Sequence, residues 1–221
     1  MSFSEGPGEG TGTPGDPPSS PPAAPALGPH PVQYTVDYPD RPLNRLTTGL
    51  RIFTAIPILI VSATVSGASY AGGGPLFLGP LVMILFRQKY PRWWFDWNRE
   101  LLRFQARVGV YVALMDDRYP STDEAQSVHL EFEYPDAARD LNRWLPLVKW
   151  LLAVPHYIVL LVLYIGALVA IVIAWFAILF TGRFPRGLFD FLVGVGRWHN
   201  RVVGYAFLLV TDRYPPFSLA A

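Results

Sequence analysis

The sequence predicts an all-α integral membrane protein of two tandem helical-hairpin modules, each with an amphipathic interfacial helix and a short cytoplasmic β-strand. Three observations lead to this prediction. The chain of 221 residues is 51% hydrophobic and only 16% charged, unlike an average soluble domain. Two long runs contain no Asp, Glu, Lys or Arg, and one set of short motifs occurs twice in the same order.

The chain begins with a tail, residues 1–30, that is rich in Pro, Gly and Ser and has no Lys or Arg and no apolar run. Such a composition cannot bury enough apolar surface to offset the entropy of ordering, so we expect disorder here. The first membrane module is expected at residues 32–120 and the second at residues 128–219.

The two apolar runs are Ile52–Phe86 and Trp150–Gly182, with 35 and 33 residues. As single helices they would be about 50 Å long, well beyond the roughly 30 Å hydrocarbon core of a bilayer. We therefore expect each run to fold into a hairpin of two short passes, with breaks at Gly72–Pro75 and at Gly166. A long tilted helix and a re-entrant loop are the alternatives, and for the first run two full passes or a re-entrant loop stay open.

The distribution of charge supports the hairpins independently. All 18 Lys and Arg residues lie outside the two runs, so hairpins place every one of them on one side of the membrane. Basic residues favour the cytoplasmic side, which predicts a multi-pass protein with both termini in the cytoplasm. A single pass per run would leave the basic residues between the runs on the opposite side, so we reject it.

The repeated motifs align at offsets of 94 to 98 residues and indicate a tandem duplication. The aligned positions are Asp37-Tyr38-Pro39 with Glu133-Tyr134-Pro135, Leu43-Asn44-Arg45 with Leu141-Asn142-Arg143, Arg51 with Lys149, Tyr90 with Phe184, Tyr111 with Tyr205, and Asp117-Arg118-Tyr119-Pro120 with Asp212-Arg213-Tyr214-Pro215. Each copy starts and ends on the same side, so the modules are parallel.

Each copy opens with a segment in which apolar and polar residues alternate, V-Q-Y-T-V-D-Y at residues 32–38 and V-H-L-E-F-E-Y at residues 128–134. A period of two predicts a half-buried strand. A lone strand is unstable, so we expect the two strands to pair across a pseudo-twofold axis on the cytoplasmic face.

Each copy closes with a basic amphipathic helix, which is typical of a segment lying in the membrane interface. Arg99, Arg103 and Arg107 form a stripe in the first copy, and Arg197 and Arg201 form its counterpart in the second. Aromatic residues favour the same interface. The expected interfacial anchors are Trp93, Trp94, Trp97 and Trp198.

Two roles are open for the basic residues. Binding to anionic lipid head groups contributes about 1 kcal/mol per basic residue near a charged surface. The candidates for head-group binding or intramolecular pairing are Arg99, Arg103, Arg107, Arg183, Arg186, Arg197 and Arg201. Acids also recur in the repeat, at Asp37, Glu133, Asp96, Asp190, Asp117 and Asp212, and this nearly balanced charge favours intramolecular pairing. The D-R-Y-P motifs favour helix-stop turns over ligands.

Little in the sequence supports catalysis. The chain has no Cys, its four His lack ligand-type spacing, and no phosphate-loop, G-x-S-x-G or dinucleotide motif occurs. We therefore expect no enzyme activity, no cofactor and no metal. His156 lies in an apolar run, where an ionisable residue is a functional candidate by default, although a lone His is more often a hydrogen-bonded structural residue.

The motifs also carry a resemblance. The D-Y-P and E-Y-P steps, Ala55–Pro57 with Ala153–Pro155, the stretch AWFAILFTGRFPRGLFDFLVGVGRWHNRV and the end LLVTDRYPPFSL resemble a family of bacterial membrane proteins known only as a domain of unknown function. Residues 130–219 match closely, whereas residues 32–120 diverge, with F-R-Q-K-Y-P in place of F-T-G-R-[FY]-P. The resemblance implies a bacterial inner (plasma) membrane protein and assigns no catalytic residues.

The function expected from these observations is that of a non-catalytic accessory or scaffold subunit. Its partners would be the lipid bilayer and either another membrane protein or further copies of itself. The alternative is an anionic-lipid-binding or lipid-transfer protein that uses the arginine stripes, and a transporter ranks third. A net charge of +1 gives no argument for nucleic acid.

Overall fold

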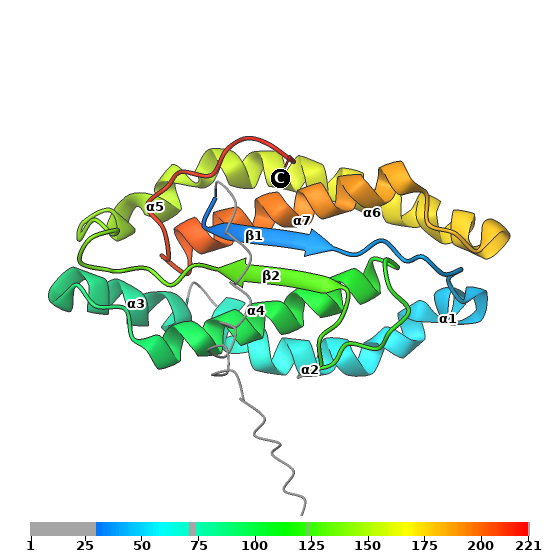
Figure 1. The fold of residues 1–221 in the computed structure, drawn as a ribbon, viewed down its shortest axis with the longest axis horizontal. Coiled ribbons are helices and arrows are strands. Elements are labelled where there is room, and N and C mark those ends of the chain that lie inside the picture. The colour runs from blue at the N-terminus through cyan, green and yellow to red at the C-terminus, as the bar shows by residue number, and fades with distance from the viewer. Residues whose placement is uncertain (1–29, 71–73, 123, 221) are drawn as a thin grey trace, which may run out of the picture.

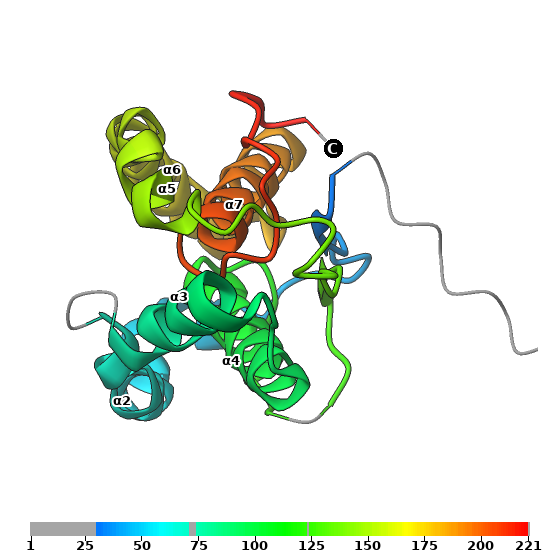
Figure 2. The ribbon, with the colours of Figure 1, turned by 90° about the vertical axis from the view of Figure 1, so that its left-hand side faces the viewer.

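The structure is a computed structural model and describes residues 30–70, 74–122 and 124–220. Its long helices run along the long axis of the molecule (Figure 1), and its two strands lie on one side of them (Figure 2). In chain order the elements are β1 (Val32–Val36), α1 (Arg45–Gly49), α2 (Arg51–Tyr70), α3 (Gly74–Arg87), α4 (Arg92–Val112), β2 (Val128–Phe132), α5 (Pro146–Leu152), α6 (Val154–Thr181) and α7 (Arg186–Ala206). The predicted disordered tail falls outside the described residues, apart from His30.

The two copies share backbone details at equivalent positions. The predicted amphipathic helices are α4 and α7, each of 21 residues, and they begin after Pro91 (φ −64°, ψ 125°) and Pro185 (φ −63°, ψ 124°). Shortly after each helix a leucine has a positive φ, 64° at Leu114 and 59° at Leu209. Positive φ is uncommon for residues other than glycine, so its recurrence shows that both copies make the same turn.

The predicted strand pairing is confirmed. Strands β1 and β2 are antiparallel, with Tyr34 opposite Leu130 and Val32 opposite Phe132. The sequence repeat also aligns Tyr34 with Leu130, so the pseudo-twofold axis passes through this pair.

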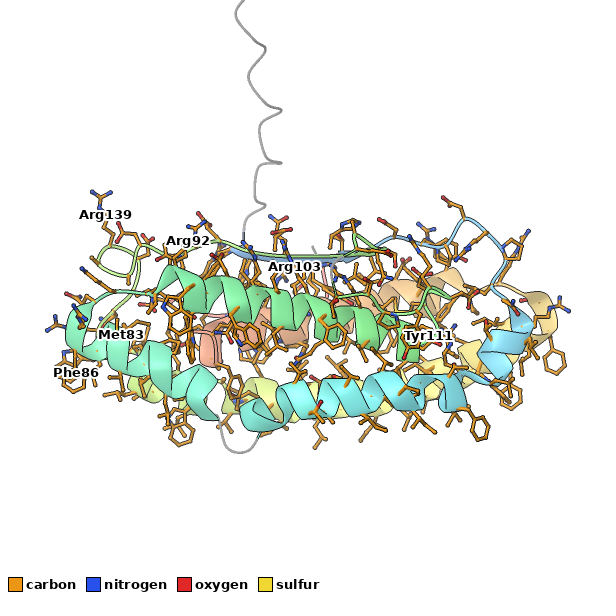
Figure 3. The ribbon with its side chains drawn as sticks, turned by 90° about the horizontal axis from the view of Figure 1, so that it is seen from below. Met83, Phe86, Arg92, Arg103, Tyr111 and Arg139 are labelled. Carbon is orange, nitrogen blue, oxygen red and sulfur yellow. The ribbon has the colours of Figure 1, made fainter. Side chains whose placement is uncertain are left out.

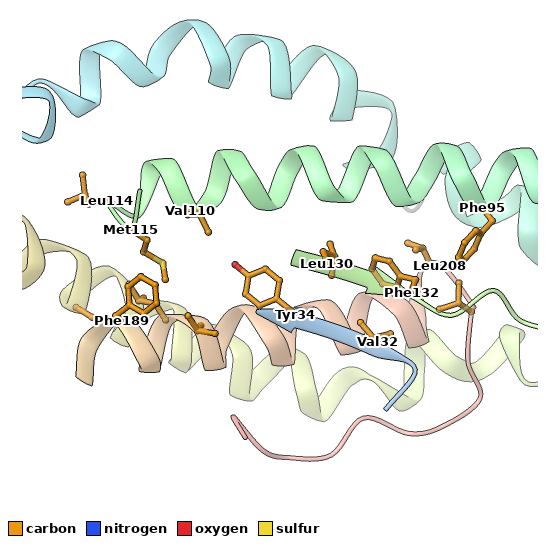
Figure 4. Packing of buried hydrophobic residues seen from close by; sticks show 14 of the residues in the cluster. Val32, Tyr34, Phe95, Val110, Leu114, Met115, Leu130, Phe132, Phe189 and Leu208 are labelled. Atoms are coloured by element: carbon orange, nitrogen blue, oxygen red, sulfur yellow. The ribbon is translucent and has the colours of Figure 1, made fainter. Parts of the chain in front are cut away.

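The copies exchange their strands, because each strand packs on the amphipathic helix of the other copy. Arg103 of α4 donates from Nε to the carbonyl oxygen of Leu130 at 2.9 Å. In the symmetric contact, Arg197 of α7 donates from Nε to the carbonyl oxygen of Tyr34 at 3.2 Å. The main hydrophobic core therefore contains residues of both copies, among them Val32, Phe95, Leu130 and Phe189 (Figure 4).

Tyrosines of the D-Y-P and E-Y-P motifs also connect the copies. The Tyr38 hydroxyl donates to the carbonyl oxygen of Phe184 at 2.6 Å, and the Tyr134 hydroxyl donates to the carbonyl oxygen of Tyr90 at 2.5 Å. Each tyrosine ring packs edge-on against a phenylalanine of the other copy. The two modules are thus interlocked around one shared core.

The predicted hairpin in the second apolar run is wrong. Helix α6 is continuous over 28 residues, and Gly166 lies within it. Gly166 lies inside the helix and does not form a turn, and a side-chain carbon there would be in ordinary contact with Cζ of Phe191, at 3.5 Å. The helix ends at Gly182, whose φ of 74° is typical of a helix C-terminus.

The hairpin predicted for the first run is not formed either. The break was predicted at Gly72–Pro75, and two of its residues, Gly72 and Gly73, lie outside the described residues. Helices α2 and α3, on either side of it, follow one another along the long axis and do not fold back (Figure 1). With 20 and 14 residues, α2 and α3 are each shorter than α6. Together they extend along the molecule much as α6 does in the other copy.

The elements form three layers (Figure 2). Helices α2 and α6 lie on one side, α4 and α7 lie in the middle, and the strands lie on the other side. Phe104 and Val108 of α4 pack on Ile58 of α2, whereas Arg103 of the same helix reaches β2. The amphipathic helices therefore turn their apolar sides to the hydrophobic helices and part of their basic sides to the sheet.

Replacing Gly196 with Ala is expected to destabilise the protein by about 1–3 kcal/mol, because overpacking a core forces neighbours to shift. The added carbon would lie 2.6 Å from Cε1 of Tyr34, on the pseudo-twofold axis. Thermal unfolding in detergent measures the effect. Gly187→Ala in the same helix is the control, since its added carbon would meet no atom within 4 Å. Equal melting temperatures for the two variants would contradict this packing.

Candidate functional site

Two buried ion pairs occupy equivalent places in the copies. Arg51 Nη2 lies 2.7 Å from Asp117 Oδ1, and Lys149 Nζ lies 2.6 Å from Asp212 Oδ1. The side chain of Arg51 is 3% exposed and that of Lys149 is fully buried. Burial lowers the pKa of Lys149, and the contact with Asp212 opposes that shift.

The same acids also hold the backbone just before the first helical segment of each copy, α1 and α5. Asp117 accepts a hydrogen bond from the backbone nitrogen of Asn44 at 2.6 Å, and Asp212 accepts one from that of Asn142 at 2.5 Å. Each asparagine side chain accepts in turn from backbone nitrogens two and three residues later. The D-R-Y-P acids therefore join the two ends of each copy.

The arginines of α4 make contacts within the molecule. Arg99 lies near Asp96 (3.5 Å) and Glu100 (3.1 Å). Arg103 contacts Glu100 at 2.9 Å and Glu131 at 2.5 Å. Arg107 donates to the backbone oxygens of residues 121 and 122.

The second copy uses its basic residues in similar ways. Arg197 and Arg201 donate to the carbonyl oxygens of Leu219 at 2.8 Å and Ala220 at 3.0 Å, so they hold the end of the described chain. Arg186 lies 3.9 Å from Asp190 and over the ring of Tyr38, 4.3 Å from its centroid.

Several of the charged residues that the sequence analysis singled out lie at the surface. The side chain of Arg183 is exposed, and no ion pair to it occurs among the residues that the structure describes. Asp37 is exposed and contacts His129 at 3.0 Å. Glu133 is also exposed. Arg186 and Asp190 form an exposed pair as well, whereas the buried pairs of Arg51 with Asp117 and of Lys149 with Asp212 hold the fold together.

The aromatic candidates divide into two groups. Trp93 and Trp97 are 68% and 55% exposed, and Trp94 is half-buried beside them. Trp198 was expected at the interface and is instead buried, because its indole nitrogen donates to Nδ1 of His156 at 3.0 Å. It is therefore a core residue and not a membrane anchor.

His156 is a packed residue of the second copy. It is fully buried, and its ring stacks on that of Phe217 with centroids 4.1 Å apart and an interplanar angle of 16°. The other histidine of interest, His199, has its Nδ1 2.7 Å from the hydroxyl of Tyr164. Within the described chain, no group of three or more metal-ligating side chains comes together.

A long apolar face covers one side of the molecule, opposite the charged side chains. Figure 3 shows Arg92, Arg103 and Arg139 along one edge, with α2 and α3 along the other. The apolar face consists of the exposed large side chains of α2 (Ile52, Phe53, Ile56, Leu59, Ile60, Val61, Val65), α3 (Leu78, Val82, Phe86) and α6 (Val154, Ile158, Leu161, Val162, Ile165, Leu168, Val169, Val172, Ile173, Phe176, Phe180).

Helix α6 dominates this face. Among the described residues it is the one helix long and apolar enough to cross a membrane, and few of its residues are buried in the protein. The apolar parts of α2 and α3 are shorter, Arg51–Val65 and Phe77–Arg87. Sequence reasoning found these helices from their hydrophobicity, but the position of all three on one face could not be found without the packing of α4 and α7.

Comparison with known proteins gives one match. Residues 144–218 match the family model described as "Domain of unknown function (DUF4389)". No curated protein and no solved structure matches the chain. The match includes α6, α7 and the second D-R-Y-P motif, and it does not extend to the first copy. The match over residues 144–218 is consistent with the uncharacterised family that the motifs resemble.

Proposed function

We propose that this protein is a non-catalytic, membrane-embedded accessory or scaffold component that assembles with another membrane protein or with itself. The observation that carries the proposal is the continuous apolar face of α2, α3 and α6. Burying one large apolar side chain contributes about 1.5–3 kcal/mol, so a face of this size is very costly in water. Soluble monomers rarely expose apolar patches larger than a few hundred Å².

The face fits a membrane in one orientation. Charged residues lie along the whole length of the opposite side, from Arg139 near one end past Arg103 in the middle (Figure 3). If the long axis crossed the bilayer, Arg103 and Glu131 would lie near its centre, where a charge costs about 2.5–3.5 kcal/mol. We therefore propose that the molecule lies flat, with the apolar face in one leaflet and the charged side in water.

The location follows from the same orientation. Both ends of the described chain lie on the side of the strands, away from α2 and α6 (Figure 2). The preference of basic residues for the cytoplasm would place this side, with both termini, at the cytoplasmic surface of a bacterial inner membrane. Many of the repeated charged residues make contacts within the molecule, mostly inside one copy and, for Arg103 and Arg197, between copies. This supports a scaffold and leaves fewer basic residues for the alternative role, anionic-lipid binding.

Placing charges on the apolar face is expected to remove the protein from the membrane. The double variant Leu161→Lys/Ile165→Lys changes two side chains that are 61% and 60% exposed on α6. Each lysine costs up to about 2.5–3.5 kcal/mol in the acyl layer and less near its surface. Carbonate extraction of membranes should then release most of the variant, whereas the control Thr35→Lys/Tyr119→Lys, on exposed residues outside this face, stays bound. Equal release of both variants would contradict the proposal.

The scaffold role is tested by purification from the native membrane in a mild detergent, followed by mass spectrometry of the proteins and lipids that remain bound. A stoichiometric membrane protein, or a defined homo-oligomer, is the expected result. Enrichment of an anionic lipid without either would favour the alternative, an anionic-lipid-binding protein.

A further inference from the structure

A cavity of about 370 Å³ lies beside the pseudo-twofold axis, between α4, α6, α7 and β1. A second cavity of about 310 Å³ lies between α6 and α7. Tyr164 and His199 line both, and the contact between the Tyr164 hydroxyl and His199 Nδ1 at 2.7 Å separates them. The first cavity is at the lower end of the range of small-molecule sites, about 300–1,000 Å³.

The wall of the first cavity is mostly apolar and contains no Asp, Glu, Lys or Arg side chain among the described residues. Small residues of α4 create much of the space. Gly109 is exposed to the cavity, and a side-chain carbon added there would meet no atom within 4 Å. On the far side, Ala167 and Ile171 of α6 form the wall, and the outer surface of α6 belongs to the apolar face.

One end of the cavity carries an unused hydrogen-bond donor. Tyr34 is 6% exposed and reaches from β1 toward α4 (Figure 4). Among the described residues, no group accepts a hydrogen bond from its hydroxyl. Burial raises the pKa of this hydroxyl, so it remains a donor at neutral pH. The hydroxyl oxygen is not among the fully enclosed polar atoms that lack a partner, so it is accessible from the cavity, where a ligand can accept its hydrogen bond.

We propose that this cavity binds an acyl chain whose ester carbonyl accepts the hydrogen bond of Tyr34. The apolar wall fits the hydrocarbon, the described lining has no Lys or Arg to pair with a free carboxylate, and the tyrosine supplies the donor. The cavity itself is independent of the proposed function, and only the source of the ligand rests on it. If the apolar face lies in a membrane, α6 has the cavity on one side and the lipid that would supply the chain on the other. A phospholipid of the bilayer and a free monoacylglycerol share this chemistry.

The test is photo-crosslinking of the full-length protein in liposomes. Two probes carry a diazirine in the acyl chain, one a phosphatidylglycerol and the other a monoacylglycerol, and mass spectrometry maps the modified residues. The expected result is cross-linking at Ala106, Ile171 and Leu192 that an excess of the unlabelled lipid suppresses. Cross-links at Val162 and Leu168, on the apolar face and outside both cavities, should follow probe concentration without such saturation. The probe that saturates the cavity identifies the source of the chain.

Gly109→Leu adds a large side chain at the cavity wall, where its first carbon would meet no atom within 4 Å. It should lower the cavity cross-links about tenfold or more, which corresponds to about 1.4 kcal/mol of binding free energy. The matched control is Gly187→Leu, a helical glycine of α7 outside the cavity with equally open surroundings. Tyr34→Phe keeps the ring and removes the donor, so it should lower cavity cross-linking by about threefold to tenfold.

The outcomes separate this inference from the proposed function. Cross-links confined to the apolar face would overturn the cavity site while leaving membrane insertion intact. Absence of cross-links from both places would overturn the proposed function itself. Saturable cavity cross-links that Gly109→Leu leaves unchanged would also overturn the inference, because the chain would then occupy a different space.

Discussion

Replacing Asp212 with Ala is expected to destabilise the protein by about 3–5 kcal/mol, the usual cost of leaving one partner of a buried ion pair alone. The ammonium of Lys149 is fully buried and 2.6 Å from this carboxylate, so the variant leaves a charge without compensation. It also removes the acceptor for the backbone nitrogen of Asn142. A loss of this size is a large part of the 5–15 kcal/mol that stabilises most domains.

Two further variants test whether the unpaired charge of Lys149 causes this loss of stability. Asp190→Ala removes an exposed ion pair, with Arg186 and Asp190 67% and 66% exposed, and should change stability by no more than about 1 kcal/mol. Lys149→Met combined with Asp212→Asn removes both charges and keeps an acceptor for Asn142, so it should recover much of the loss. Chemical unfolding in detergent measures all three. A loss for Asp212→Ala no greater than that for Asp190→Ala would show that the pair is not structural.

Local patterns in the sequence were sufficient to predict the elements that carry the repeat. Alternation over seven residues predicted both strands, and the duplication predicted their pairing, because a lone strand is unstable and each copy supplies one. The arginine stripes predicted the amphipathic helices. The acids at matching positions favoured pairing, and the sequence repeat already aligned Arg51 with Lys149 and Asp117 with Asp212.

Other features depend on contacts between distant residues. Helix length and a central glycine suggested a hairpin at Gly166, but a single glycine is tolerated inside a helix, and α6 continues through it. Trp198 has the spacing of an interfacial residue, and only its contact with His156 makes it buried. The exchange of strands between the copies has no local signature, because the same strand could pack on either amphipathic helix.

Cysteine labelling is expected to show that the molecule lies flat in the membrane. The chain contains no native cysteine, so single-cysteine variants have no background. Arg139 lies near one end of the long axis, and Arg183 follows α6 at the other end (Figures 1 and 3). We expect Arg139→Cys and Arg183→Cys to react with a membrane-impermeant maleimide only after permeabilisation of intact cells. Leu168→Cys, at the middle of α6 and 63% exposed on the apolar face, should not react in either condition.

The three positions distinguish the possible arrangements. If the long axis crossed the bilayer, the two ends would lie on opposite sides, and one of the two end variants would react in intact cells. If α6 opened into a hairpin, its middle would reach the outer surface, and Leu168→Cys would react there. Helix α6 is about 42 Å long at 1.5 Å per residue, which exceeds the roughly 30 Å hydrocarbon core. Lying flat, it needs neither a tilt nor a break, and the charged residues along the opposite side remain in water.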